Sequence, residues 1–232
     1  MMTSLEMSEP VIHEMPNKVC YIGNVMIMET CSMTRKGIRR LLEQPTFQVM
    51  HYLEAPAVND ISLMMLRSNA NLVIMDLSGE GESIMDGLRV IGQFQGNWPM
   101  TPLIVCTVLA DTRLLKQLVA MGVSGIYLKQ DPLSSLTECI SQVMENKNSY
   151  STQVTELLAD RIAHPPLLTY REMDVLECLF TGKSVKTTAQ VLHRDIRTIS
   201  THKRNAMIKL GFNNNCELYT WGAELSRYGA MV

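Results

Sequence analysis

Residues 168–211 read LTYREMDVLECLFTGKSVKTTAQVLHRDIRTISTHKRNAMIKLG, and this stretch decides the fold of the last third of the chain. It contains no β-type run, and its apolar residues recur at the three- and four-residue spacing of amphipathic helices. Gly182 and Gly211 stand where helix C-caps are expected, and Thr169 and Asp195 are good N-cap residues. We expect four helices, over residues 170–180, 185–192, 196–210 and 214–228.

The helix expected over 196–210 sorts its side chains onto two faces. Arginines and small hydroxyl residues share one face, which suits the major groove of double-stranded DNA, because small side chains permit close approach while arginines reach guanine edges or phosphates. The preceding helix, joined by a turn at 193–195, has the length to cross the DNA backbone. The inward face is expected to hold Ile196, Ile199, Ala206 and Leu210, with His202 or Lys203 between them. The candidate DNA-binding residues are Lys183, Arg197, Thr198, Ser200, Thr201, Lys203 and Arg204.

Charge is distributed unevenly along a chain of 232 residues whose formal net charge is -2. Between Lys183 and Lys209 there are seven basic residues and one acid, whereas residues 1–167 carry twelve basic and seventeen acidic residues. An acidic first part and a locally basic second part are typical of a DNA-binding domain attached to a regulatory domain.

A family resemblance agrees with this interpretation of the helices. The residues 168–176, Gly182-Lys183-Ser184, 198–203 and Lys209-Leu210-Gly211 resemble the signature of the LuxR/FixJ-type helix-turn-helix family, in its order and spacing. The resemblance implies that Ser200, Thr201 and Arg204 point to base edges and that the helix after Gly211 helps to pair two subunits. It also implies that His202 is a packing residue.

Residues 18–147 alternate short apolar runs with helical patterns, which indicates a parallel sheet covered by helices. Five strands and five helices in alternation predict a flavodoxin-like doubly wound domain, so the fold class is α/β plus all-α. The extra apolar run 18–23 forms either a sixth strand or an extension of the first. Strands are expected at 25–28, 47–52, 72–75, 103–106 and 125–128, and helices at 35–43, 60–67, 85–94, 112–121 and 133–144.

The expected domain boundaries follow from these patterns. Residues 1–17 are polar and form a leader, and residues 18–147 form the α/β domain. Residues 148–167 form a linker, with a possible short helix over 154–162, that breaks at Pro165-Pro166. Residues 168–232 form the helix-turn-helix domain. There is no run of eighteen apolar residues to span a bilayer and no signal peptide, so we expect a soluble, cytoplasmic protein without membrane contact. Six scattered cysteines predict neither disulfides nor a zinc site.

The carboxyl ends of the expected strands carry residues suited to phosphoryl capture. Asp76 is the possible phosphoacceptor, with Glu29, Thr107 and Lys129 around it. These residues, with Gly87 and the run 125–129, resemble response-regulator receivers of the NarL class. In that class an acidic pair ends the first strand, and its second member, an aspartate, contacts Mg²⁺.

The second member of that acidic pair is missing from this chain. The pair is Glu29-Thr30, and a threonine hydroxyl cannot replace a carboxylate as a charged ligand for Mg²⁺. Glu80 and Glu82 offer carboxylates, but nothing in the sequence places them. We therefore expect a pseudo-receiver, with Mg²⁺ as a cofactor only if the receiver is functional.

The run 29–37 resembles the auxiliary Rcs-type capsule regulators, whereas 128–130 and 198–211 resemble their phosphorylatable partner. This resemblance implies a DNA-binding transcription regulator that acts as a homodimer or with a related Rcs-type receiver regulator. The alternatives are a response regulator switched by phosphorylation of Asp76, or an adaptor that sequesters a partner regulator without contacting DNA. An enzyme is not expected, because no nucleophile, base and orienting group occur together.

Overall fold

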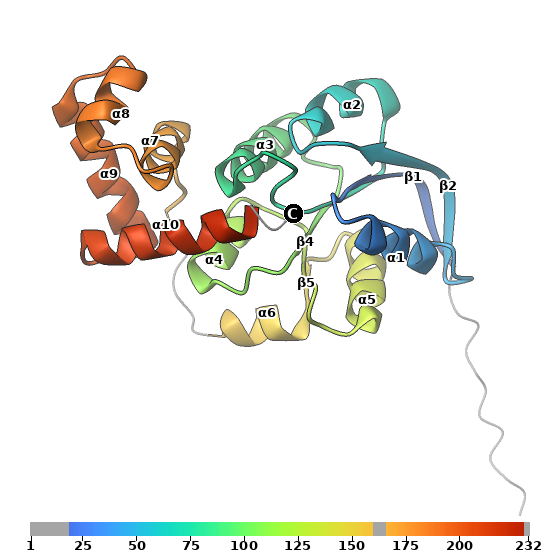
Figure 1. The fold of residues 1–232 in the computed structure, drawn as a ribbon. Coiled ribbons are helices and arrows are strands. Elements are labelled where there is room, and N and C mark those ends of the chain that lie inside the picture. Colours follow the sequence, from blue (N-terminus) through green and yellow to red (C-terminus); the bar gives the residue numbers. More distant parts are fainter. Residues whose placement is uncertain (1–18, 160–165, 230–232) are drawn as a thin grey trace, which may run out of the picture.

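The computed structural model describes residues 19–159 and 166–229. An α/β domain, residues 19–157, precedes a helical domain, residues 166–229, and the two lie in contact (Figure 1). The expected leader 1–17 lies outside the described residues. Within the described ranges, no helix is long and apolar enough to cross a membrane.

One six-stranded parallel sheet forms the centre of the α/β domain, in the order β2-β1-β3-β4-β5-β6. Because β1 lies between β2 and β3, the chain changes direction across the sheet there, and the carboxyl ends of β1 and β3 face a common crevice. The α/β class is thus confirmed. The strands are β1 (Cys20–Met28), β2 (Phe47–Ala55), β3 (Leu72–Met75), β4 (Leu103–Thr107), β5 (Gly125–Leu128) and β6 (Ser149–Tyr150).

The undecided run at 18–23 belongs to the first strand. Cys20, Tyr21 and Ile22 pair with residues 47–49 of β2, so β1 continues through Gly23 without a break. The side chain of Asn71 lies against Gly23 and accepts a hydrogen bond from the amide of Asn24 at 2.7 Å. A close approach of this kind requires glycine, because an added Cβ would lie 2.2 Å from the Asn71 oxygen.

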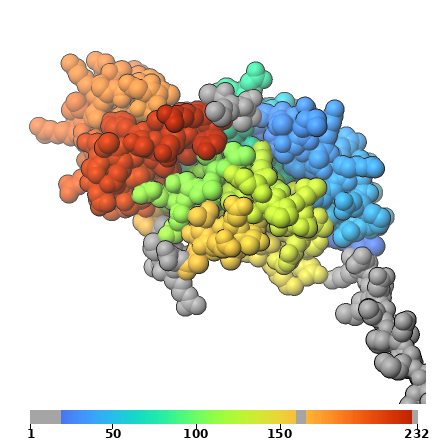
Figure 2. Space-filling view, turned by 60° about the horizontal axis from the view of Figure 1, so that its bottom comes forward, coloured from blue at the N-terminus to red at the C-terminus, as the bar shows by residue number. Residues whose placement is uncertain are grey.

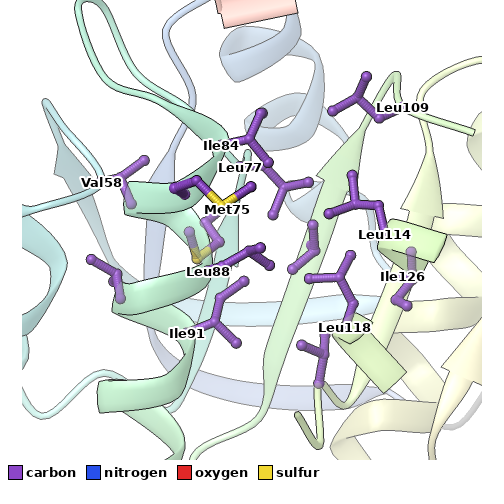
Figure 3. Close-up of a cluster of buried hydrophobic side chains, with 14 of the residues drawn as sticks. Val58, Met75, Leu77, Ile84, Leu88, Ile91, Leu109, Leu114, Leu118 and Ile126 are labelled. Carbon is purple, nitrogen blue, oxygen red and sulfur yellow. The ribbon is translucent and has the colours of Figure 1, made fainter. Parts of the chain in front are cut away.

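Helices cover both faces of the sheet, and each helix buries one apolar stripe against it. On one face, α1 (Ser32–Leu42) and α5 (Leu133–Met144) enclose a core that includes Ile27, Ile74 and Ile140. The other face carries α2 (Asp60–Ser68), α3 (Ile84–Asn97) and α4 (Thr112–Ala120). Figure 3 shows its core, where Met75 and Ile126 of the sheet meet Leu88, Ile91, Leu114 and Leu118 of the helices.

The segment expected as a linker, 148–167, begins with regular structure. Ser149 and Tyr150 form β6 and pair with Gly125 and Ile126 of β5. The short helix α6 (Thr152–Leu157) follows, and its Val154 is fully buried in the core of the sheet. These residues extend the α/β domain to Leu157. Of the rest of the expected linker, residues 160–165 lie outside the described ranges.

The helical domain has the four helices that its sequence predicts: α7 (Tyr170–Phe180), α8 (Val185–Val191), α9 (Ile196–Leu210) and α10 (Asn215–Gly229). Thr169 and Glu172 form a capping box at the start of α7, and the Asp195 carboxylate caps α9. Gly211 ends α9 in the left-handed conformation, at φ +73°. Local sequence signals therefore define where these helices begin and end.

Candidate nucleic-acid interface and acidic pocket

The third helix of the domain, α9, has one polar face that no other element covers. Arg197, Thr198, Ser200, Thr201 and Arg204 are all exposed. The Ser200 hydroxyl donates to the carbonyl of Ile196 at 2.9 Å and the Thr201 hydroxyl to that of Arg197 at 3.0 Å. These bonds hold both hydroxyls against the backbone of α9, between Arg197 and Arg204.

Two of the candidate lysines are engaged by neighbouring side chains. Lys203 is half-buried, and its ammonium donates to the Asn215 side chain of α10 at 3.0 Å. Lys183 lies in the turn before α8, where its ammonium donates to the Thr181 hydroxyl at 2.8 Å. The structure thus brings five of the seven candidates together on the exposed face of α9, with Lys203 at its edge and Lys183 outside the helix.

The inward face of α9 agrees with the sequence pattern except at its first residue. Ile199, Ala206 and Leu210 are buried, and His202 is half-buried. Ile196 is 47% exposed, so its predicted inward position was wrong. Ile196 is the first residue of α9, and at that end of the helix its side chain is not buried by a neighbouring element.

An ion pair fixes α9 against α7. The ammonium of Lys209 lies 2.7 Å from the buried Glu172 carboxylate and also donates to the carbonyl of Leu167 at 2.9 Å. Burial alone would raise the pKa of Glu172, but the Lys209 ammonium and the bonds from Thr169 outweigh it, so the pKa is lowered. Lys209 therefore contributes to the packing of the helices, although the sequence places it in the basic segment.

In the α/β domain, the carboxyl ends of four strands bring Glu29, Asp76, Thr107 and Lys129 together in one nearly buried cluster, which we call the acidic pocket. The ammonium of Lys129 lies 2.6 Å from Glu29 Oε2 and 2.6 Å from Asp76 Oδ2. Backbone amides satisfy the other oxygens: Cys31 donates to Glu29 and Leu77 to Asp76. The Thr107 hydroxyl accepts from the amide of Leu109 at 3.1 Å.

These ionic groups are nearly removed from water. The exposed fraction is 1% for the Glu29 side chain, 8% for Asp76 and 16% for Lys129. Burial alone would lower the pKa of Lys129, but the two carboxylates outweigh it and raise the pKa. The ammonium thus stays charged and pairs with both carboxylates.

The pocket does not provide the ligand set that Mg²⁺ requires. The hydroxyl oxygen of Thr30 is buried and has no hydrogen-bond partner among the described residues, at the position where a second acidic residue is expected. Across residues 19–159 and 166–229, no three His, Cys, Asp or Glu side chains form a metal-binding group. Two carboxylates that share one lysine are a poor match for a cation that binds several charged oxygens.

Glu82, one of the two carboxylates that follow Asp76 in the sequence, is engaged elsewhere in the fold. It accepts hydrogen bonds from the backbone amides of Val58 at 2.7 Å and Asn59 at 3.0 Å, and from the Asn59 side chain at 2.7 Å. It therefore ties the 79–83 turn to the segment that leads into α2. Glu80 is exposed, so neither residue replaces the missing carboxylate beside Glu29.

Comparison with known families matches both parts of the chain. Residues 25–141 match the family described as response regulator receiver domain. Residues 166–221 match the family described as bacterial regulatory proteins, luxR family. The first match runs from within β1 to within α5, and the second covers α7 to α9 and the first half of α10.

Individual relatives share this organisation. The transcriptional regulatory protein RcsB of Escherichia coli (strain K12) is 28% identical over 204 residues, which cover 85% of this chain and 93% of RcsB. The nitrate/nitrite response regulator protein NarP of the same strain is 30% identical over 195 residues, covering 80% of this chain and 87% of NarP. Both are named as regulators rather than enzymes.

Solved structures of RcsB also resemble this chain. One is the structure of RcsB from Salmonella enterica serovar Typhimurium, bound to promoter rprA in the presence of the phosphomimetic BeF3-. It has a TM-score of 0.61 and 28% identity, and the match covers 88% of this chain and 98% of the RcsB chain. A structure of two RcsB dimers bound to two parallel DNAs has a TM-score of 0.55 and 27% identity. The match covers 85% of this chain and 96% of the RcsB chain. The chain belongs to the response-regulator family, as a DNA-binding transcription regulator with a receiver domain and a luxR-family helix-turn-helix domain.

Proposed function

We propose that this protein regulates transcription in the bacterial cytoplasm as a dimer that reads double-stranded DNA through α9, and that DNA binding does not depend on phosphorylation of Asp76. Ser200, Thr201 and Arg204 contact base edges. Arg197, Thr198, Lys183 and Lys203 contact the phosphate backbone, which gives affinity without sequence preference.

The exposed polar face of α9 carries this proposal. Along α9, Arg197 precedes and Arg204 follows the two hydroxyl residues Ser200 and Thr201. All four side chains are exposed. Arginine is the side chain that most often reads guanine, because its fork donates two parallel hydrogen bonds to the base edge. If these side chains belonged to a buried polar network or to a set of surface ion pairs, they would have partners within the domain.

Dimer formation is supported by the outer side of α10. Leu218, Trp221 and Leu225 face inward, which leaves Tyr219 and Ala223 exposed on the opposite side of the helix. RcsB is found as dimers on DNA. We propose that α10 pairs two subunits of this chain, or one subunit with a related Rcs-type receiver regulator.

Independence from phosphorylation is supported by the charges around Asp76. The Lys129 ammonium already compensates Asp76 and Glu29, and Thr30 adds no charge. Phosphoryl transfer to an aspartate requires a cation to neutralise the developing charge. The pocket residues do not fit that cation, so Asp76 has a structural role as an ion-pair partner.

Thr30→Asp should create the Mg²⁺ affinity that the natural pocket lacks. The new carboxylate stands next to Glu29, so three carboxylates face the pocket instead of two. At a Mg²⁺ concentration about ten times the dissociation constant, the variant gains about 1.4 kcal/mol of stability. Thermal unfolding with and without Mg²⁺ measures this gain, and the neutral variant Thr30→Asn is the matched control. Strong stabilisation of the unmodified protein by Mg²⁺ contradicts the proposal.

The test of the proposed function is a titration of promoter DNA with the purified full-length chain, alone and together with a related Rcs-type regulator. Tight binding by the chain alone identifies a homodimer, and tight binding only with the partner identifies a heterodimeric co-regulator. Absence of sequence-preferring binding in both cases overturns the proposal and favours an adaptor that sequesters its partner.

A further inference from the structure

The two domains are joined by a well-packed interface. One contiguous cluster of buried apolar side chains includes Leu114 and Leu118 of α4 together with Met173 and Leu176 of α7 and Trp221 of α10. In Figures 1 and 2 the helical domain lies against the side of the α/β domain that carries α3 and α4. An interface of this kind does not open without a specific cause, since opening exposes apolar surface to water.

Arg89 of α3 forms an ionic clamp between the domains. Its guanidinium lies 2.6 Å from Glu177 and 3.1 Å from Asp174, both on α7, and 2.9 Å from Asp86 on its own helix. The Arg89 side chain is only 19% exposed. Ser83, at the start of α3, donates to the second oxygen of Glu177 at 3.3 Å. Planar, multiple contacts of arginine with carboxylates fix orientation as well as distance.

Arg113 of α4 forms a second clamp, at the end of the DNA-reading helix. Its Nε donates to the carbonyl of Leu210, the last residue of α9, at 3.1 Å. Its guanidinium carbon lies 4.7 Å from the centre of the Phe212 ring, and that ring packs against Trp221 of α10 at 5.5 Å. A cation at the C-terminus of a helix is favourable because the last carbonyls there lack partners. The α/β domain thus holds α9 directly.

A buried glutamine fixes the chain segment that enters α7. The Gln117 side chain of α4 donates to the carbonyl of Pro166 at 3.2 Å and accepts from the amide of Leu168 at 3.1 Å. Gln117 is 2% exposed. Paired donor and acceptor contacts from one buried amide leave the segment little freedom to move.

The docked arrangement leaves the DNA-reading face in solvent. The contact between α9 and the α/β domain lies at Leu210, whereas Arg197, Ser200, Thr201 and Arg204 are exposed. Docking therefore does not cover the surface that reads DNA. If DNA binding does not depend on phosphorylation of Asp76, as proposed above, no phosphoryl signal is required to release the helical domain.

We propose that the docked arrangement is itself the form that binds DNA, and that Arg89 and Arg113 are positioning residues that set the direction of α9 relative to the α/β domain. This inference rests on the proposed function. In a dimer, two rigidly docked subunits present their recognition helices at one fixed separation. Paired half-sites on B-DNA lie about 34–36 Å apart, so a fixed separation favours binding to both at once.

Loosening the clamps should reduce binding to paired half-sites while single half-sites are unaffected. Arg89→Ala and Arg113→Ala are combined in the full-length chain. The matched control combines Arg40→Ala with Lys36→Ala, at exposed positions of α1. It removes the same positive charge far from the interface between the two domains. Two helices on loosely attached domains bind with a lower effective local concentration, and we expect a loss of about tenfold in affinity for the paired site.

Three measurements are made on each protein: the radius of gyration by small-angle X-ray scattering, the affinity for a duplex with two half-sites, and the affinity for a duplex with one. The half-sites are those that the natural protein protects from cleavage. The expected result is a larger radius, weaker binding to two half-sites and unchanged binding to one, with the control like the natural protein.

Unchanged or tighter binding to two half-sites in an expanded variant overturns the inference, because the docked form is then neutral or inhibitory. An unchanged radius also overturns it, because the clamps then do not hold the domains. A natural protein that binds no DNA overturns the proposed function instead, and the scattering still reports whether the clamps hold the two domains together.

Discussion

Replacing Arg204 by alanine should weaken binding to promoter DNA by about 30-fold or more. A bidentate contact between arginine and guanine contributes about 1–3 kcal/mol, and a dimer loses two of them. Arg204 is exposed, so its removal should change the free energy of unfolding by less than about 0.5 kcal/mol. Fluorescence anisotropy on promoter DNA measures the affinity.

The control for this variant is Arg40→Ala, which removes one positive charge from the exposed surface of α1 and should leave DNA affinity unchanged. A second readout is sequence preference. Loss of a base contact reduces the advantage of promoter DNA over random DNA, whereas loss of a phosphate contact weakens both equally. Equal affinity of Arg204→Ala and the natural protein would show that the exposed face of α9 does not read DNA.

Replacing Lys129 by methionine should destabilise the protein by about 3–5 kcal/mol, because it leaves buried carboxylates without their counter-charge. Both carboxylates concerned, on Glu29 and Asp76, lie 2.6 Å from the ammonium. Methionine keeps most of the aliphatic length, so the loss is mainly electrostatic. Urea unfolding of the natural protein and the variant gives the difference.

Two further variants separate charge from packing. Lys147→Met removes a lysine whose side chain is 65% exposed and pairs with Glu145 at the surface, and it should have almost no effect. Adding Asp76→Asn to Lys129→Met removes one of the uncompensated charges and should recover part of the stability. A loss below about 1 kcal/mol for Lys129→Met alone would mean that water or another group compensates the carboxylates.

Most of the fold could be predicted because its signals are local. Five strands and all the longer helices begin and end within a few residues of the predicted positions, since apolar runs and caps such as Thr169 and Asp195 act over one turn. The strand β6 was missed because Ser149-Tyr150 has no apolar run of its own and is defined by its pairing with β5. The exposure of Ile196 likewise depends on where the neighbouring helices end.

The candidate sites were predicted to different extents. Parallel strands bring their carboxyl ends together, so the meeting of Asp76 and Lys129 follows from the fold class. The interdomain clamps could not be predicted, because Arg89 and Glu177 are 88 residues apart and neither belongs to a motif. Glu82 was ambiguous in sequence, and its hydrogen bonds to Val58 and Asn59 arise only in the folded chain.

If this regulator binds DNA without phosphorylation of Asp76, a mimic of the phosphoryl group should not change its affinity for DNA. The affinity of the natural protein for promoter DNA is determined with and without beryllofluoride and Mg²⁺, with an RcsB protein as the positive control for the reagent. We expect equal dissociation constants within about twofold, a difference below 0.5 kcal/mol. Binding that is about tenfold or more tighter with beryllofluoride would contradict it and would identify Asp76 as a working phosphoacceptor.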